Sequence, residues 1–125
     1  MAWELDSGRP IYAQIIERIH LDIITGHYQP GEKLPSVRDL AATAAVNPNT
    51  MQKALAELER EGLLYTMRTS GRFITEDAEK IRKMKEELAA MQVREFVRKM
   101  HQLGLENGEI LKLIDTIMKE ENSHE

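Results

Sequence analysis

The sequence of 125 residues contains no cysteine and no long apolar run. Without cysteine it can form no disulfide framework, no thiolate zinc site and no cysteine nucleophile. No apolar stretch approaches the roughly 18 residues that a membrane-spanning helix needs, and the N-terminus does not join a basic segment to an apolar one. We therefore expect a cytoplasmic protein with no membrane partner.

The sequence also lacks the residue groups on which catalysis depends. It offers no nucleophile paired with a base and no paired carboxylates, and its four histidines show no ligand spacing. We expect no enzyme activity, no bound metal and no cofactor.

Acidic residues are missing from two stretches, although they are frequent elsewhere. The chain has 21 aspartates and glutamates against 17 lysines and arginines, and a net charge of -4. Residues 40–56 and residues 62–75 contain no acidic residue at all. A surface that faces phosphates must avoid carboxylates, because each would repel the nucleic-acid backbone. Short acid-free stretches also arise by chance, so this observation needs the support of a motif.

Residues 34–64 supply that motif, because they predict two short helices joined by a tight turn. Ser36 can cap the first helix through its hydroxyl. Asn47 is a strong N-cap residue for the second helix, and Pro48 suits the first helical position, where no backbone donor is lost. Gly62 ends the second helix, which runs to about Glu61. This is the outline of a helix-turn-helix.

Helical spacing of apolar residues predicts which faces of the helices form the core. A helix over residues 10–25 precedes the motif, and the three helices bury three sets of residues: Ile11, Ile15, Ile19 and Ile23; Val37, Leu40, Ala41 and Ala44; Met51, Ala54, Leu55 and Leu58.

Residues 63–75 change period and predict a β-hairpin, or wing. Tyr65, Phe73 and Ile74 favour strands, and Ser70 with Gly71 supplies a turn. Residues 33–34 are expected to add a short strand to the same sheet.

Three segments resemble the winged-helix domain of the GntR family: residues 35–41 (Pro-Ser-Val-Arg-Asp-Leu-Ala), residues 47–50 (Asn-Pro-Asn-Thr) and residues 58–63 (Leu-Glu-Arg-Glu-Gly-Leu). The Asn-Pro-Asn-Thr segment and the short C-terminal part resemble the YtrA-type branch. The resemblance covers residues 9–75 closely. It implies a mainly α fold with a small β-hairpin wing, in which a winged helix-turn-helix DNA-binding domain, residues 1–75, precedes a helical dimerisation tail, residues 76–125.

The sequence departs from the family pattern at three positions. Thr69 and Arg72 stand where the family has glycine and a small residue, so the conformation of the wing is open. Ala45 stands in the tight turn, where related chains often carry glycine.

The residue types at the start of the second helix suit the major groove of DNA. Asparagine and glutamine can pair with adenine, and a threonine methyl can pack on thymine, so an A/T-containing half-site is expected. Alternatively, some of these residues hold a phosphate at the helix N-terminus.

Arginines extend the expected DNA-binding surface beyond this helix. The resemblance implies that Arg38 contacts DNA; the alternative is a salt bridge with Asp39 or Glu32. Arg68 and Arg72 of the wing are candidates for phosphate or minor-groove contacts. The predicted DNA-binding residues are Ser36, Arg38, Asn47, Pro48, Asn49, Thr50, Gln52, Lys53, Arg68, Thr69, Ser70, Gly71 and Arg72.

The tail predicts two amphipathic helices, one ending at Gly104 and one over residues 108–121. Two such helices cannot form a core alone, so a second copy of the chain is the expected partner. The alternative is an intrachain hairpin folded onto the winged domain. The predicted dimerisation residues are Ile81, Met84, Leu88, Met91, Phe96, Met100, Ile110, Leu113, Ile114 and Ile117.

These patterns together predict a regulator of transcription that binds double-stranded DNA as a homodimer. The resemblance implies a repressor at a two-fold symmetric operator, upstream of genes for an ABC-type transporter. The tail, about 45 residues long, cannot enclose a drug-sized pocket within one chain, so any small-molecule effector would bind at the dimer interface or between tail and winged domain. The competing hypothesis is a winged-helix adaptor that binds protein and not DNA.

Overall fold

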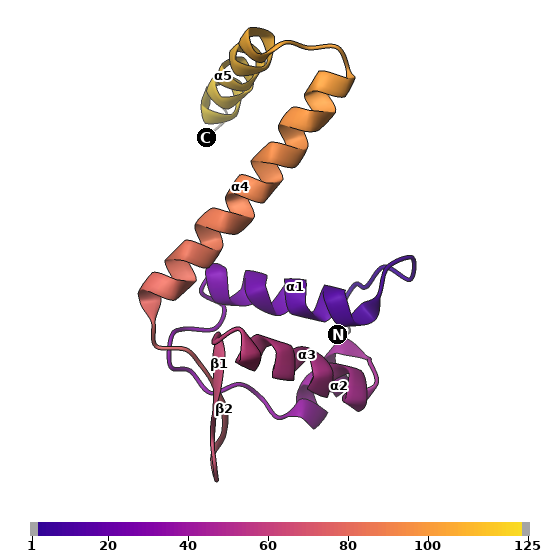
Figure 1. Cartoon of the computed structure of the whole chain (residues 1–125), viewed down its shortest axis with the longest axis vertical. Coiled ribbons are helices and arrows are strands. Elements are labelled where there is room, and N and C mark those ends of the chain that lie inside the picture. The colour runs from indigo at the N-terminus through magenta and orange to yellow at the C-terminus, as the bar shows by residue number, and fades with distance from the viewer. Residues whose placement is uncertain (1–2, 124–125) are drawn as a thin grey trace. The chain divides into compact units, whose positions relative to one another are not determined.

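The computed structural model describes residues 3–123, which contain five helices and one two-stranded antiparallel sheet (Figure 1). The elements are α1 (Ile11–Ile24), α2 (Val37–Ala44), α3 (Pro48–Arg60), β1 (Leu64–Met67), β2 (Gly71–Ile74), α4 (Ala78–Gln102) and α5 (Asn107–Ser123). The predicted mainly α fold with a hairpin wing is confirmed. No helix within residues 3–123 combines the length and apolarity needed to cross a membrane.

The chain forms two compact units, and the first of them ends at Lys85. It therefore contains the winged helix and the beginning of α4. Ile81 and Met84, on that part of α4, pack against the core of the first unit, although their spacing had suggested a role in dimerisation.

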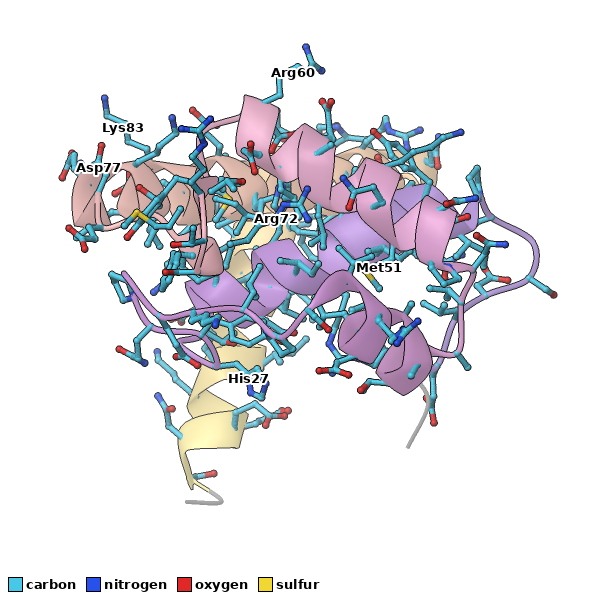
Figure 2. The ribbon with its side chains drawn as sticks, turned by 90° about the horizontal axis from the view of Figure 1, so that it is seen from below. His27, Met51, Arg60, Arg72, Asp77 and Lys83 are labelled. Carbon is cyan, nitrogen blue, oxygen red and sulfur yellow. The ribbon has the colours of Figure 1, made fainter. Side chains whose placement is uncertain are left out.

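The core of the first unit lies around helix α3. Helices α1 and α2 and strand β1 all pack against α3 (Figure 1). Figure 2 shows Met51 on the side of α3 that faces α1. The predicted face of α3 is confirmed, because its buried residues are Met51, Ala54, Leu55 and Leu58.

Side-chain caps begin both helices of the helix-turn-helix, as the sequence predicted. The Ser36 hydroxyl accepts a hydrogen bond from the Asp39 amide at 3.1 Å. The Asn47 side chain accepts one from the Asn49 amide at 2.7 Å, and Pro48 begins α3. These bonds satisfy amides that have no partner inside a helix.

Ala45 ends α2 in the left-handed conformation, with φ 59° and ψ 48°. It is the one residue other than glycine with positive φ among residues 3–123. The turn therefore forms without the glycine that related chains often carry, at the cost of strain between Cβ and the backbone, about 1–2 kcal/mol.

Replacing Ala45 by glycine is expected to raise the free energy of unfolding by about 0.5–1 kcal/mol. Glycine removes the strain of the folded state, and this gain exceeds the loss that comes from the greater conformational entropy of glycine in the unfolded chain. Ala42 is the matched control, since it is exposed inside α2, where glycine should cost about 1 kcal/mol. Urea unfolding of both variants measures the difference. Destabilisation by both would contradict the assignment of strain to position 45.

The wing closes despite Thr69. Leu64 pairs with Ile74, Tyr65 with Phe73 and Met67 with Gly71. The Ser70 amide donates to the Met67 carbonyl at 3.0 Å, and Gly71 supplies the positive φ of 109° that the turn requires. The expected third segment is confirmed as an isolated bridge between Lys33 and Phe73.

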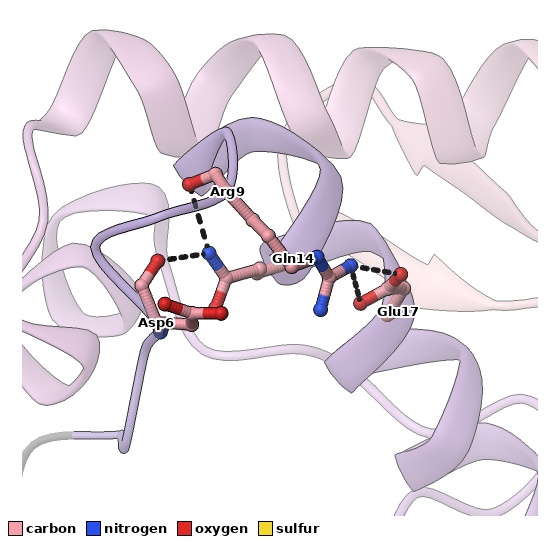
Figure 3. A network of polar contacts seen from close by, with 4 residues as sticks. All are labelled: Asp6, Arg9, Gln14 and Glu17. Atoms are coloured by element: carbon pink, nitrogen blue, oxygen red, sulfur yellow. Dashed lines mark hydrogen bonds and ion pairs between the residues drawn. The ribbon is translucent and has the colours of Figure 1, made fainter.

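Gln14 holds the N-terminal segment against α1 (Figure 3). Its buried amide accepts a hydrogen bond from the Asp6 backbone nitrogen and donates one to the Asp6 carbonyl, both at 2.6 Å. Nearby, Arg9 forms an ion pair with Glu17 at 2.5 Å. The ring of Trp3 packs against the core and lies 4.7 Å from the guanidinium carbon of Arg18. The segment is thus fixed to the winged helix.

The second unit begins at Glu86 and contains the rest of α4 and all of α5. The Leu105 amide donates to the Met100 carbonyl at 3.2 Å, which closes the turn after α4, and Gly104 lies in this turn as predicted. Ile110 is buried, whereas many other apolar side chains are exposed: Met91, Val93, Phe96, Leu103, Leu111, Leu113, Ile117 and Met118.

Candidate nucleic-acid interface

The first half of α3 turns its polar residues away from the core. Asn49, Gln52 and Lys53 are exposed and Thr50 is half-buried, while Met51 between them is fully buried. The period of 3.6 residues per turn separates these two faces. The exposed face carries amide, hydroxyl and ammonium groups, which are the donors and acceptors that read base edges. It carries no carboxylate before Glu57.

The start of α2 contributes Ser36 and Arg38. Arg38 is exposed and forms no ion pair in the described part of the chain. The alternative pairing with Asp39 or Glu32 is therefore not formed, and a carboxylate oxygen of Glu32 instead accepts the Gln29 amide at 2.8 Å. The Ser36 hydroxyl oxygen serves as the cap of α2, which leaves its hydrogen free to donate.

A hollow of about 780 Å³ lies between the start of α2 and the wing. It brings Ser36, at the start of α2, together with the predicted wing residues Ser70, Gly71 and Arg72, and Lys33, which was not among the predicted residues, also lines it. Its lining includes Lys33, Ser36, Ser70, Gly71 and Arg72. The strand predicted at residues 33–34 could have indicated this position, because pairing of Lys33 with Phe73 of the wing brings Lys33 to the hollow. The tip residues Arg68 and Thr69 are exposed but do not line the hollow.

The side chain of Arg72 lies against α3 (Figure 2). Its side chain is only 19% exposed. Its Nε donates to Glu59 Oε1 and its Nη1 to Gln52 Oε1, each at 3.3 Å. The Thr66 hydroxyl donates to the same Glu59 oxygen at 2.5 Å. A phosphate or minor-groove contact by Arg72 stays a prediction.

A second hollow, of about 600 Å³, lies beside the outer face of α3. Tyr12, Thr50, Lys53 and Arg60 contribute to its lining. Tyr12 is exposed and thus not part of the core. Arg60 hydrogen-bonds to Glu57 and thereby lowers the pKa of that carboxyl, while its own pKa is raised. The charge of Arg60 is consequently offset by its own helix.

Exposed cations without a carboxylate partner remain on three elements around these hollows. Arg38 on α2, Lys53 on α3 and Arg68 in the wing form no ion pair among residues 3–123. Arg60 and Arg72, by contrast, are both paired with glutamates of α3. The unpaired charges are the ones available to neutralise phosphates.

Comparisons with known proteins point in the same direction. The model of the family described as bacterial regulatory proteins, gntR family, matches residues 11–74. The uncharacterized HTH-type transcriptional regulator YhcF of Bacillus subtilis is 41% identical over 113 residues, which are 90% of this chain and 93% of that protein. The HTH-type transcriptional repressor YtrA of Bacillus subtilis is 50% identical over 72 residues, 58% of this chain and 55% of that protein.

Solved structures extend the similarity to the fold. A GntR family transcriptional regulator from Listeria monocytogenes superimposes with a TM-score of 0.84 at 39% identity, over 90% of this chain and 98% of that one. The AraR DNA-binding domain in complex with operator ORX1 matches 60% of this chain and 92% of that one, with a TM-score of 0.52 and 32% identity.

Proposed function

The chain belongs to the GntR family of bacterial transcriptional regulators, with YtrA-type relatives, and from this premise we propose that it is a repressor that binds a two-fold symmetric operator as a homodimer. The relative YtrA is named a repressor, and AraR was solved bound to an operator. A regulator that occupies an operator can repress by excluding the transcription machinery.

The observation that carries the DNA-binding role is the composition of the outer face of α3. Asn49, Gln52 and Lys53 are exposed there, and Arg38 on α2 and Arg68 in the wing are exposed without a carboxylate partner in the part of the chain described. A protein-binding adaptor would instead need apolar or acidic residues on this face. The polar and cationic set suits base edges and phosphates.

The dimer is proposed from the second unit, whose exposed apolar side chains are too many for a solvated surface. Met91, Phe96, Leu113 and Ile117 are all at least 40% exposed. A second copy offers the same apolar residues and would cover them isologously. Of the remaining predicted residues, Leu88, Met100 and Ile114 are half-buried in this unit. Ile81 and Met84 serve the core of the first unit, and Ile110 is already buried.

The regulated genes are proposed by family resemblance to encode an ABC-type membrane transporter. A small-molecule effector would then report the need for transport.

Selection of binding sites from a random duplex pool tests the function, followed by a salt titration of the selected duplex against random DNA. We expect a two-fold symmetric consensus whose affinity falls steeply with salt, because counterions are released from each neutralised phosphate. Absence of any enrichment at low salt, with or without cell extract, would overturn the operator-binding role and favour the adaptor.

Arg68→Ala is expected to weaken binding to the selected and the random duplex by the same factor. Its guanidinium is exposed in the wing and unpaired among residues 3–123, so it suits a phosphate contact, which carries no sequence information. The slope of the logarithm of affinity against the logarithm of salt should fall by about 1 for each subunit. Arg98→Ala is the control, because Arg98 forms an ion pair with Glu95 in α4. A loss confined to the selected duplex would assign Arg68 to base reading instead.

A further inference from the structure

We propose that Arg72 of the wing is a positioning residue that fixes the side-chain amide of Gln52, so that α3 presents the amide nitrogen of Gln52 to the DNA. This inference rests on the proposed operator binding. It concerns which base Gln52 recognises, and it assigns Arg72 a role in specificity in place of a phosphate contact.

The contact joins two elements that the fold brings together. Arg72 lies on β2 opposite Thr66 of β1, and its Nη1 donates to Gln52 Oε1 at 3.3 Å. Its Nε donates to Glu59 Oε1, also at 3.3 Å. Gln52 and Glu59 are roughly two helical turns apart and share one face of α3. The guanidinium therefore spans this face between them.

Glu59 holds the guanidinium in place. Its Oε1 accepts the Thr66 hydroxyl at 2.5 Å as well as Arg72 Nε. The side chain of Arg72 is 19% exposed, so most of it is packed away from solvent. A long side chain that is packed and tied to a carboxylate loses little further freedom when it also holds Gln52.

The chemistry of guanidinium settles which end of the amide it meets. A guanidinium has five donors and no acceptor, so the atom of Gln52 beside Arg72 must be the carbonyl oxygen. The amide nitrogen, with two hydrogens, is then the group left to face the groove. A small side chain at position 72 could not reach α3 and would leave the amide free to turn over.

The fixed orientation changes the preferred base. A freely turning glutamine pairs with adenine by accepting from N6 and donating to N7. With its oxygen turned toward Arg72, Gln52 presents its amide nitrogen to the groove, and guanine, whose N7 and O6 are both acceptors, is the matching edge. We infer guanine at the position read by Gln52, whereas Asn49 retains the expectation of adenine.

The base pair read by Gln52 is identified as the one at which Gln52→Ala abolishes the preference between bases. The test then measures affinity for the selected operator with each of the four base pairs at that position. For the unmodified full chain we expect guanine to be favoured over adenine by about tenfold. Arg72→Thr should reduce this ratio to within about twofold, and Arg72→Lys, which can still donate to the oxygen, should restore part of it. In a Gln52→Ala background, Arg72→Thr should change nothing further at this base pair.

Three results would overturn the proposal: an unchanged guanine preference in Arg72→Thr, an equal loss on every duplex including random DNA, or an effect that persists without Gln52. The second of these would restore the phosphate contact.

A measurement without DNA separates this proposal from the proposed function. In the ¹⁵N-labelled full chain, Arg72→Thr should shift the side-chain amide resonances of Gln52 and leave those of Gln92 on α4 unchanged. Unmoved Gln52 resonances would overturn the contact itself. A failure of the unmodified chain to select any site would instead overturn operator binding, whatever the resonances show.

Discussion

Replacing Leu58 by alanine is expected to lower the free energy of unfolding of the first unit by about 3 kcal/mol. Leu58 has no exposed surface and lies on the face of α3 against which α1, α2 and β1 pack. The loss combines the transfer energy of the removed methyl groups with the cavity that remains. It is a large part of the roughly 5–10 kcal/mol that stabilises a domain of this size. Urea unfolding followed by helical circular dichroism measures it.

Leu21→Ala is the matched control, because it makes the same chemical change on α1 at a side chain that is 55% exposed. It should cost less than about 1 kcal/mol. Similar losses at both positions would mean that Leu58 does not lie in the core as described. Operator affinity per folded molecule should be unchanged by either substitution, since neither side chain belongs to the exposed face of α3.

The core and the caps of the winged helix could be predicted because they depend on local patterns. Met51 and Leu58 are two turns apart on α3, so their burial follows from helical periodicity alone. Ser36 and Asn47 cap helices through hydrogen bonds to residues two or three positions away. Such bonds are decided within one turn of chain and need no knowledge of the rest of the fold.

The position of Arg72 could not be predicted, because it depends on contacts between elements. Its side chain meets Gln52 and Glu59, which precede it by 20 and 13 residues in the sequence. Alternation along a strand predicts the face from which a side chain leaves the sheet, but not where a long flexible chain ends. The charge of Arg72 alone predicts a contact with phosphate. The sequence does not indicate that the carboxylate of Glu59 lies beside it.

The apolar stripe of α4 shows a second limit of periodicity. Ile81 and Met84 belong to the same helical stripe as Leu88 and Met91, but they pack on the core of the first unit. A stripe predicts that a helix face is buried and says nothing of what covers it.

The burial of Gln14 is a third feature that the sequence could not predict. Its amide is buried by pairing with the backbone of Asp6, a contact that no short motif indicates.

Replacing Ile117 by glutamate is expected to convert the proposed dimer to a monomer and to lower operator affinity by at least about 100-fold. Ile117 is 46% exposed on α5, beside other exposed apolar side chains of the second unit. A carboxylate placed in an apolar interface must lose its hydration without a partner. A monomer carries only one winged helix, so it loses the effective concentration that a second, linked winged helix provides. Sedimentation at micromolar concentration and binding to the selected operator measure the two effects.

Thr116→Glu is the matched control, because it adds the same charge at the neighbouring exposed position of α5, away from the apolar face. It should leave both assembly and affinity unchanged. Binding to a duplex with one half-site should be equal in the unmodified chain and in Ile117→Glu, since each winged helix remains intact. If Ile117→Glu stays dimeric with full operator affinity, the exposed face of α5 is not the interface. If it is monomeric but binds the operator as tightly as before, one winged helix suffices for recognition, and the proposal of a two-fold symmetric operator would have to be abandoned.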